Sequence, residues 1–209
     1  MSVLNQLGIT VGLGNKTGQI FESLFPDFLS IKYNTPSEYI SHCWNIYKES
    51  GNLSNNQNGK IFEYILATLF IREKMLPVYI SAKVAFVPNV IYDLMFYTDE
   101  RGPICISAKT SLRERYKQAD LEAIALKYVH RKALSYLITL EPSEALSVKA
   151  KIKSGDVIGL DNVIVATSDE FNDLIKSLKE YKFSEPPTVK VIKSNQVITL
   201  DKAKKVLNF

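Results

Sequence analysis

Residues 90–122 read VIYDLMFYTDERGPICISAKTSLRERYKQADLE, and they predict two neighbouring strands followed by a helix. The run at 90–97 is β-branched, aromatic and apolar, which favours a buried strand over a helix. Turn-forming residues at 98–102 let the chain double back, so residues 103–109 read as the returning strand of a hairpin. The charged segment that follows is predicted to begin a helix.

Two charged side chains fall on this predicted hairpin. Asp93 is the only charged residue at 90–97, and a carboxylate in such a place is costly unless it is paired or bound to a cation. Strand alternation puts Lys109 on the same face as Cys105 and Ser107, at the end of the returning strand. The sequence therefore predicts a lysine beside the strand that carries Asp93.

An aspartate on one strand and a lysine near the end of the next resembles the PD-(D/E)xK nuclease superfamily. Its usual pattern has an acid two residues before the lysine, where this chain has Ser107, and a proline where this chain has Tyr92. A branch of type II restriction endonucleases, which cut CCGG, CCNGG and CCWGG sites, has a neutral residue at the first position and takes the missing carboxylate from the following helix. In several of these the acid comes after twelve intervening residues, a spacing that leads here from Lys109 to Glu122.

The same branch reads guanine and cytosine with an Arg-acid-Arg triplet that starts four residues after the catalytic lysine. Arg113, Glu114 and Arg115 occupy these positions. Arginine pairs bidentately with guanine O6 and N7, and an acid accepts from cytosine N4, so the triplet suits a C:G-containing DNA site. The resemblance covers about 33 residues well and the flanks only in their order of elements. On composition alone, the same segment is also typical of a solvated helix face.

The resemblance implies a role for each acid and for the lysine. Asp93 and Glu122 would bind Mg²⁺, an ion that prefers oxygen ligands. Lys109 would orient or activate the attacking water and offset negative charge as it builds. Glu63, in an apolar helix predicted at 59–74, is a further catalytic candidate, because in this superfamily a preceding helix often brings a glutamate to the metal site. An acid favoured by the helix dipole is an equally good interpretation of Glu63.

A predicted polar loop at 51–58 contains the amides Asn55, Asn56 and Gln57. Amide side chains can pair with base edges in the minor groove, so Gln57 is a candidate for DNA recognition. A simple solvated loop is the alternative.

Composition is that of a globular protein. The 209 residues, 46% hydrophobic and 23% charged, predict a single domain over 1–209, with 188–209 as a candidate appendage. A net charge of +4 is compatible with a polyanionic partner. Cys43 and Cys105 lack paired spacing, and the sequence has no membrane-length apolar run and no signal-peptide pattern. We therefore expect a cytoplasmic protein with reduced thiols and no membrane contact.

The flanking segments complete an α/β pattern. Strands are predicted at 78–87, 135–140 and 162–167, and helices at 36–49, 143–153 and 169–183, with Ser37 and Asp169 as caps. An antiparallel run of three strands followed by helical crossovers gives a central mixed β-sheet flanked by helices, which is the restriction-endonuclease-like core that the resemblance implies. Residues 188–209 contain a short β-like stretch and a lysine-bearing tail.

A palindromic site needs two active sites related by a two-fold axis, so a homodimer acting on double-stranded DNA is expected. The resemblance also implies 5′-phosphate ends with 5′ overhangs and a cognate DNA methyltransferase as functional partner, in a bacterium or archaeon. Two other hypotheses stay open. One is a repair or structure-selective nuclease of the same fold, which would not need the Arg-Glu-Arg triplet, and the other is a non-catalytic DNA-binding module.

Overall fold

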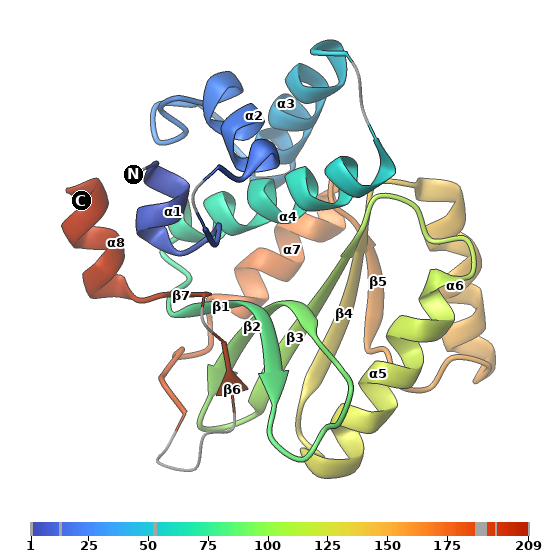
Figure 1. Ribbon diagram of the computed structural model, residues 1–209. Coiled ribbons are helices and arrows are strands. Elements are labelled where there is room, and N and C mark those ends of the chain that lie inside the picture. The colour runs from blue at the N-terminus through green and yellow to red at the C-terminus, as the bar shows by residue number, and fades with distance from the viewer. Residues whose placement is uncertain (1, 13, 52–53, 187–191, 195, 209) are drawn as a thin grey trace.

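The computed structural model describes residues 2–12, 14–51, 54–186, 192–194 and 196–208. Its centre is a seven-stranded mixed sheet with helices on both faces (Figure 1). The strand order is β5-β4-β3-β2-β1-β6, and β7 also pairs with β1. The strands are β1 (Val78–Val84), β2 (Tyr92–Thr98), β3 (Gly102–Lys109), β4 (Leu134–Thr139), β5 (Asn162–Val165), β6 (Ile192–Lys193) and β7 (Gln196–Ile198).

Strand directions follow from the connections between the strands. Short connections join β1 to β2 and β2 to β3, and both pairs are antiparallel. The β3–β4 and β4–β5 pairs are parallel, because a helix carries the chain back between their members. The predicted antiparallel run followed by a parallel part is confirmed. Lys109 pairs with Thr139, so it ends a central strand with neighbours on both sides.

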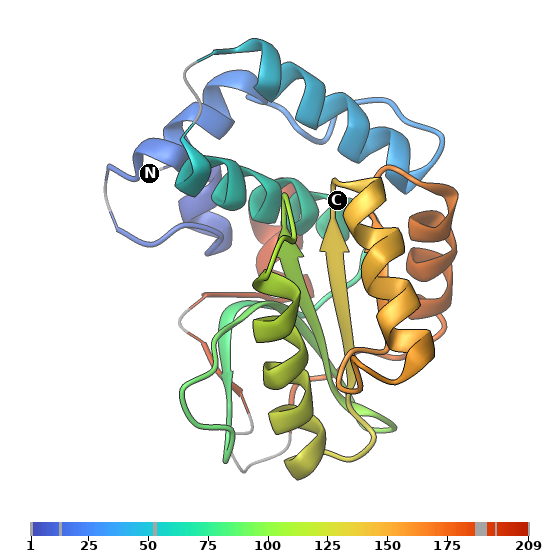
Figure 2. The ribbon, with the colours of Figure 1, turned by 90° about the vertical axis from the view of Figure 1, so that its right-hand side faces the viewer.

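The helices form a layer on each side of the sheet. Figures 1 and 2 show α5 and α6 on one face, and α4 and α7 on the other with α3 outside α4. The helices are α1 (Val3–Leu7), α2 (Lys16–Leu24), α3 (Pro36–Glu49), α4 (Asn55–Arg72), α5 (Arg115–Val129), α6 (Pro142–Ser154), α7 (Asp169–Leu178) and α8 (Leu200–Leu207).

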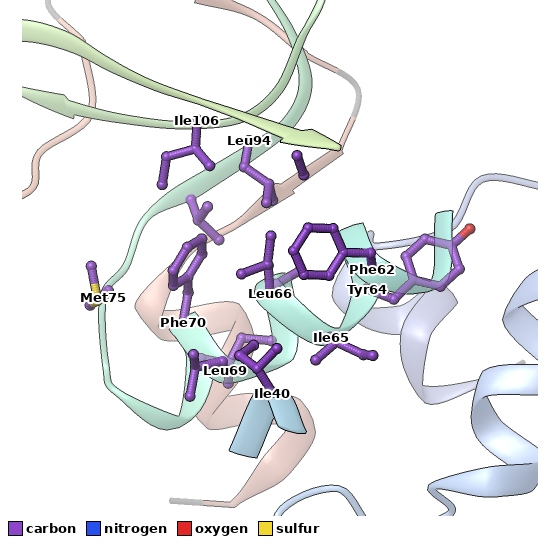
Figure 3. Packing of buried hydrophobic residues seen from close by; sticks show 14 of the residues in the cluster. Ile40, Phe62, Tyr64, Ile65, Leu66, Leu69, Phe70, Met75, Leu94 and Ile106 are labelled. Carbon is purple, nitrogen blue, oxygen red and sulfur yellow. The ribbon is translucent and has the colours of Figure 1, made fainter. Parts of the chain in front are cut away.

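Helix α4 is the centre of the larger core. Every residue from Ile61 to Ile71 is buried, which agrees with the apolar character of this segment on most of its surface. Figure 3 shows side chains of α4 between the sheet and α3, with Phe62 and Leu66 lying toward Leu94 of β2. This packing fixes α4, and therefore Glu63, against the sheet.

The opposite face of the sheet has its own cores beneath α5 and α6. Leu112, Tyr116 and Ala123 pack with Leu137 of β4 and with residues of α6. Cys105 belongs to a further cluster that includes Leu126 of α5, whereas Ile104 and Ile106 lie in the α4 core. The predicted alternation along β3 is therefore confirmed.

Several predicted boundaries are wrong for local reasons. Residues 55–58 are the first turn of α4 and not a loop, because Ser54 caps the helix and forms a reciprocal capping box with Gln57. Thr35, not Ser37, caps α3, with Pro36 in the favoured first helical position. Ser168, not Asp169, is the N-cap position of α7.

Other elements are shorter than predicted. β1 ends at Val84, after which Phe86 has a left-handed φ of 64° that interrupts an extended strand. β5 ends at residue 165 and α7 ends at residue 178.

The C-terminal segment joins the β1 edge of the sheet. Residues 187–191, 195 and 209 lie outside the described part of the chain, and the predicted β-like stretch is represented by β6 and β7, both antiparallel to β1. Ile198 and Ala203 are buried in the α4 core. None of the helices in the described ranges has the length and hydropathy needed to cross a bilayer.

Candidate active site

Asp93 and Lys109 form an ion pair at the open end of the β2–β3 hairpin, opposite the turn. Asp93 Oδ2 lies 2.6 Å from Lys109 Nζ, and the two side chains are 17% and 23% exposed, respectively. The structure thus brings together the acid and the lysine that the sequence places on neighbouring strands. Both remain accessible enough to meet a ligand.

The local geometry of the hairpin explains this contact. The paired residues of β2 and β3 run from Thr98 and Gly102 to Leu94 and Ile106, and Asp93 lies one residue beyond them. Its Oδ2 accepts hydrogen bonds from the Ala108 amide at 2.8 Å and from Ser107 Oγ at 3.4 Å, besides that from Lys109. Ser107, where the superfamily motif has an acid, therefore contacts the aspartate directly.

All three of these bonds reach one oxygen of Asp93. Within the described residues, no hydrogen bond is made to Oδ1. A carboxylate that is fixed through one oxygen and free at the other is suited to binding a cation without losing its orientation.

The strand on the other side of Asp93 is distorted. Ser81 falls between the Ile80–Leu94 and Ala82–Tyr92 pairs, which places it opposite Asp93, and its φ is 49°. A left-handed conformation is unfavourable for a serine in a strand and persists only where its surroundings enforce it. Ser81 lines a cavity of about 170 Å³ together with Lys60 and Glu63 of α4.

Glu63 lies at the edge of this arrangement. It is 7% exposed, and its Oε2 is 2.7 Å from Lys60 Nζ. Burial and, to a lesser extent, the charge of Asp93 raise the pKa of Glu63, whereas Lys60 and Lys109 lower it, and the net result is a pKa of about 7. Because Glu63 is in the third turn of α4, beyond the reach of the helix terminus, the dipole interpretation is the weaker one.

Glu122 approaches the site from α5. Burial raises its pKa and the charge of Asp93 adds to this, whereas a hydrogen bond from Gln118 and the charge of Lys109 lower it. Gln118 Nε2 donates to Glu122 Oε1 at 2.8 Å, and Tyr92 Oη donates to the Glu122 carbonyl at 3.0 Å. Tyr92, the neighbour of Asp93, thus ties this turn of α5 to β2.

The donor chemistry of the site fits a hard cation. Asp93 and Glu122 are oxygen donors beside one lysine, and the pKa of Glu122 is raised in part by Asp93, so a positive ion would relieve their repulsion. Among the described residues no three His, Cys, Asp or Glu side chains are grouped to hold a metal. Mg²⁺ commonly uses one or two carboxylates and completes its shell with water and phosphate oxygens, so two acids suffice.

The Arg-Glu-Arg triplet lies at the start of α5. The helix begins at Arg115, so the prediction that all three charged residues open it is wrong for Arg113 and Glu114. Arg113 is exposed with a φ of 42°, a conformation that interrupts a right-handed helix. Arg115 Nη2 donates to the Ser111 carbonyl at 2.6 Å and to Ser111 Oγ at 2.9 Å, and Glu114 pairs with Lys117.

Gln57 lies on a different element from the triplet. Its side-chain oxygen accepts from the Ser54 amide at 3.3 Å, so part of this side chain serves the helix cap. Figure 1 shows the start of α4 and the connection from β3 to α5 at the same end of the sheet, where Lys109 ends its strand.

The side chains that contact the predicted acids were not identified from the sequence. Lys60 and Gln118 contact Glu63 and Glu122, and each stands one helical turn before its acid, a spacing that could have identified it. The distortion at Ser81 had no signal in the sequence, because serine is not a residue that favours positive φ.

Comparison with known proteins identifies a solved structure with a similar fold. No protein-family model and no curated protein sequence matches the chain. Among solved structures, one described as "Restriction endonuclease PspGI-substrate DNA complex" matches with a TM-score of 0.51 and 17% sequence identity, covering 94% of this chain and 92% of that one. The match covers nearly the whole chain, which contains the mixed sheet and its flanking helices. The chain therefore has the restriction-endonuclease-like α/β fold.

Proposed function

We propose that this protein is a type II restriction endonuclease that cleaves both strands of a short palindromic C:G-containing DNA site, of CCGG or CCNGG type, with Mg²⁺ as cofactor. The observation that carries the proposal is the ion pair of Asp93 and Lys109 at the open end of the β2–β3 hairpin, with Glu122 and Glu63 close enough for their pKa values to respond to it. The shared fold with an endonuclease solved on its DNA substrate supports it.

In this proposal each residue has a separate task. Asp93, fixed through Oδ2, and Glu122, fixed through Gln118 and Tyr92, would hold Mg²⁺. The ion supplies the positive charge that phosphodiester hydrolysis requires. Lys109 orients the attacking water and offsets the negative charge that builds on the phosphate. Glu63, whose pKa is about 7, can hold or release a proton at the edge of the site.

DNA recognition is assigned to the loop that follows the catalytic strand. Arg113, Glu114 and Arg115 begin only four residues after Lys109, so base contacts and the scissile phosphate fall within the reach of one segment. Gln57 would contribute from the start of α4. Cutting both strands of a palindrome requires a second copy of the site, so the active form is a homodimer, with a cognate DNA methyltransferase protecting the host site.

Lys109→Ala tests the catalytic assignment. Cleavage with Mg²⁺ should be lost, while site-specific binding measured in Ca²⁺ by gel shift should be retained, because the triplet does not depend on this ammonium group. Lys176→Ala is the matched control, since Lys176 is exposed on α7 across the sheet from α5. Cleavage by Lys109→Ala at the rate of the control would overturn the proposed active site.

A further inference from the structure

Glu144 of α6 contacts the loop that carries the Arg-Glu-Arg triplet. Its Oε2 accepts a hydrogen bond from the Leu112 amide at 2.5 Å, and its Oε1 accepts from the Arg113 amide at 3.3 Å. We propose that Glu144 is a specificity-determining residue, which fixes the main chain from which Arg113 reaches the DNA. This inference rests on the proposed function and adds a residue to it.

The conformation of the loop shows why an acid is needed there. Arg113 has a φ of 42°, a conformation that is unfavourable for a residue with a side chain. Consecutive amides beside a left-handed residue form a small concave site for an anion, and the Glu144 carboxylate fills it. Hydrogen bonds to a charged acceptor are about twice as strong as those between neutral groups, so this contact stabilises a conformation that the arginine alone would leave.

Both ends of the contact are held in the core. Leu112 is fully buried, and it packs in one cluster with Ala145, the residue next to Glu144. The carboxylate therefore connects two fixed points, one on α6 and one at Leu112, and the exposed Arg113 directly follows Leu112. Among the described side chains, Arg113 has no hydrogen bond or ion pair from its guanidinium. Its direction is thus set by its main chain, and Glu144 controls that main chain.

Glu141 provides a matched control. It lies at the N-cap position of the same helix, is exposed and makes no side-chain capping bond. Glu141→Gln and Glu144→Gln therefore remove the same charge from the same helix end, and only the second removes an acceptor from the loop. A difference between the two variants isolates the contact from the change in attraction to DNA.

The experiment measures competition between a duplex that contains the cleavage site and a scrambled duplex, in Ca²⁺, for wild type, the two glutamine variants, Arg113→Ala and Arg113→Ala/Glu144→Gln. Glu144→Gln should lower the preference for the cognate duplex about tenfold, the effect of losing a bond to a charged acceptor, and Glu141→Gln should not. Once Arg113 is alanine, Glu144→Gln should cause no further loss. An additive loss in the double variant would refute action through Arg113.

Two further readouts separate folding from function. In wild type, the Leu112 amide proton should resonate downfield because its bond is short and charged, and Glu144→Gln should shift it upfield with the thermal midpoint little changed. Glu144→Asp keeps the charge but shortens the reach, so it should also lose discrimination. If wild type shows no preference, the proposed function fails; if wild type discriminates and Glu144→Gln matches Glu141→Gln, only the role of Glu144 fails.

Discussion

Replacing Glu63 by glutamine is expected to stabilise the protein at neutral pH but not under acidic conditions. Burial among the apolar residues of α4 and the nearby Asp93 raise the pKa of Glu63 from its ordinary 4.5 to about 7. In the unfolded chain this carboxyl loses its proton near its ordinary pKa, whereas in the folded protein it keeps the proton until higher pH. The folded state binds more protons between these values, so its stability falls as the pH rises through this window.

The size of the effect follows from the same values. A rise of the Glu63 pKa from 4.5 to about 7 lowers the free energy of unfolding of the wild type by about 3 kcal/mol between a pH below 4.5 and a pH above 7. Glutamine is neutral throughout, so Glu63→Gln should not show this loss. The free energy of unfolding of the variant, relative to wild type, should therefore increase by up to about 3 kcal/mol across the window.

Urea unfolding at a series of pH values from 4.5 to 8 measures this difference directly. Glu49→Gln is the control, because Glu49 is an exposed residue at the end of α3, and its stability curve should run parallel to that of wild type. If the curve of Glu63→Gln also ran parallel to wild type, Glu63 would have an ordinary pKa. The reasoning that places it beside Asp93 in a poorly solvated site would then be refuted.

Four other substitutions test three separate parts of the structure. Arg113→Ala or Arg115→Ala should each reduce site discrimination by about 1–3 kcal/mol in competition binding, and unchanged discrimination would remove the triplet from recognition. Glu122→Gln should slow cleavage at saturating DNA while leaving binding in Ca²⁺ intact, because it would remove one of the two proposed Mg²⁺ ligands; a wild-type cleavage rate would exclude Glu122 from the site. Gly159→Ala should lower the free energy of unfolding by about 1–3 kcal/mol, because a Cβ would lie 2.4 Å from the Asp120 carbonyl oxygen. An unchanged thermal midpoint would show that the loop accommodates the Cβ without loss of stability.

The hairpin and its two charged residues were predictable because their signals are local. The apolar run with a single acid, the turn residues and the alternation that ends in Lys109 are properties of consecutive residues, and they fix which strands are neighbours. Glu122 was identified only through the resemblance, which implies an acid at this spacing from the lysine. The structure supplies the physical reason, since Tyr92 holds the Glu122 turn of α5 against β2.

Contacts between segments distant in sequence were not predictable in the same way. The hydrogen bonds that Glu144 accepts from the triplet loop join residues 31 or 32 positions apart. They depend on α5 and α6 lying side by side on one face of the sheet. The start of α4 was misplaced because Asn55, Asn56 and Gln57 are typical of loops. Their helical conformation depends on the cap at Ser54, which outweighs the weak preferences of these residues.

The central claim is that Asp93 and Lys109 belong to a site-specific DNA-cleaving centre. The most direct test is digestion of a fully sequenced plasmid or phage DNA by the purified protein with Mg²⁺, followed by sequencing of the fragment ends. We expect discrete fragments whose ends share one short palindromic C:G-containing site, with 5′-phosphates and a constant 5′ overhang. Uncut DNA, random ends or cutting confined to branched DNA would contradict it.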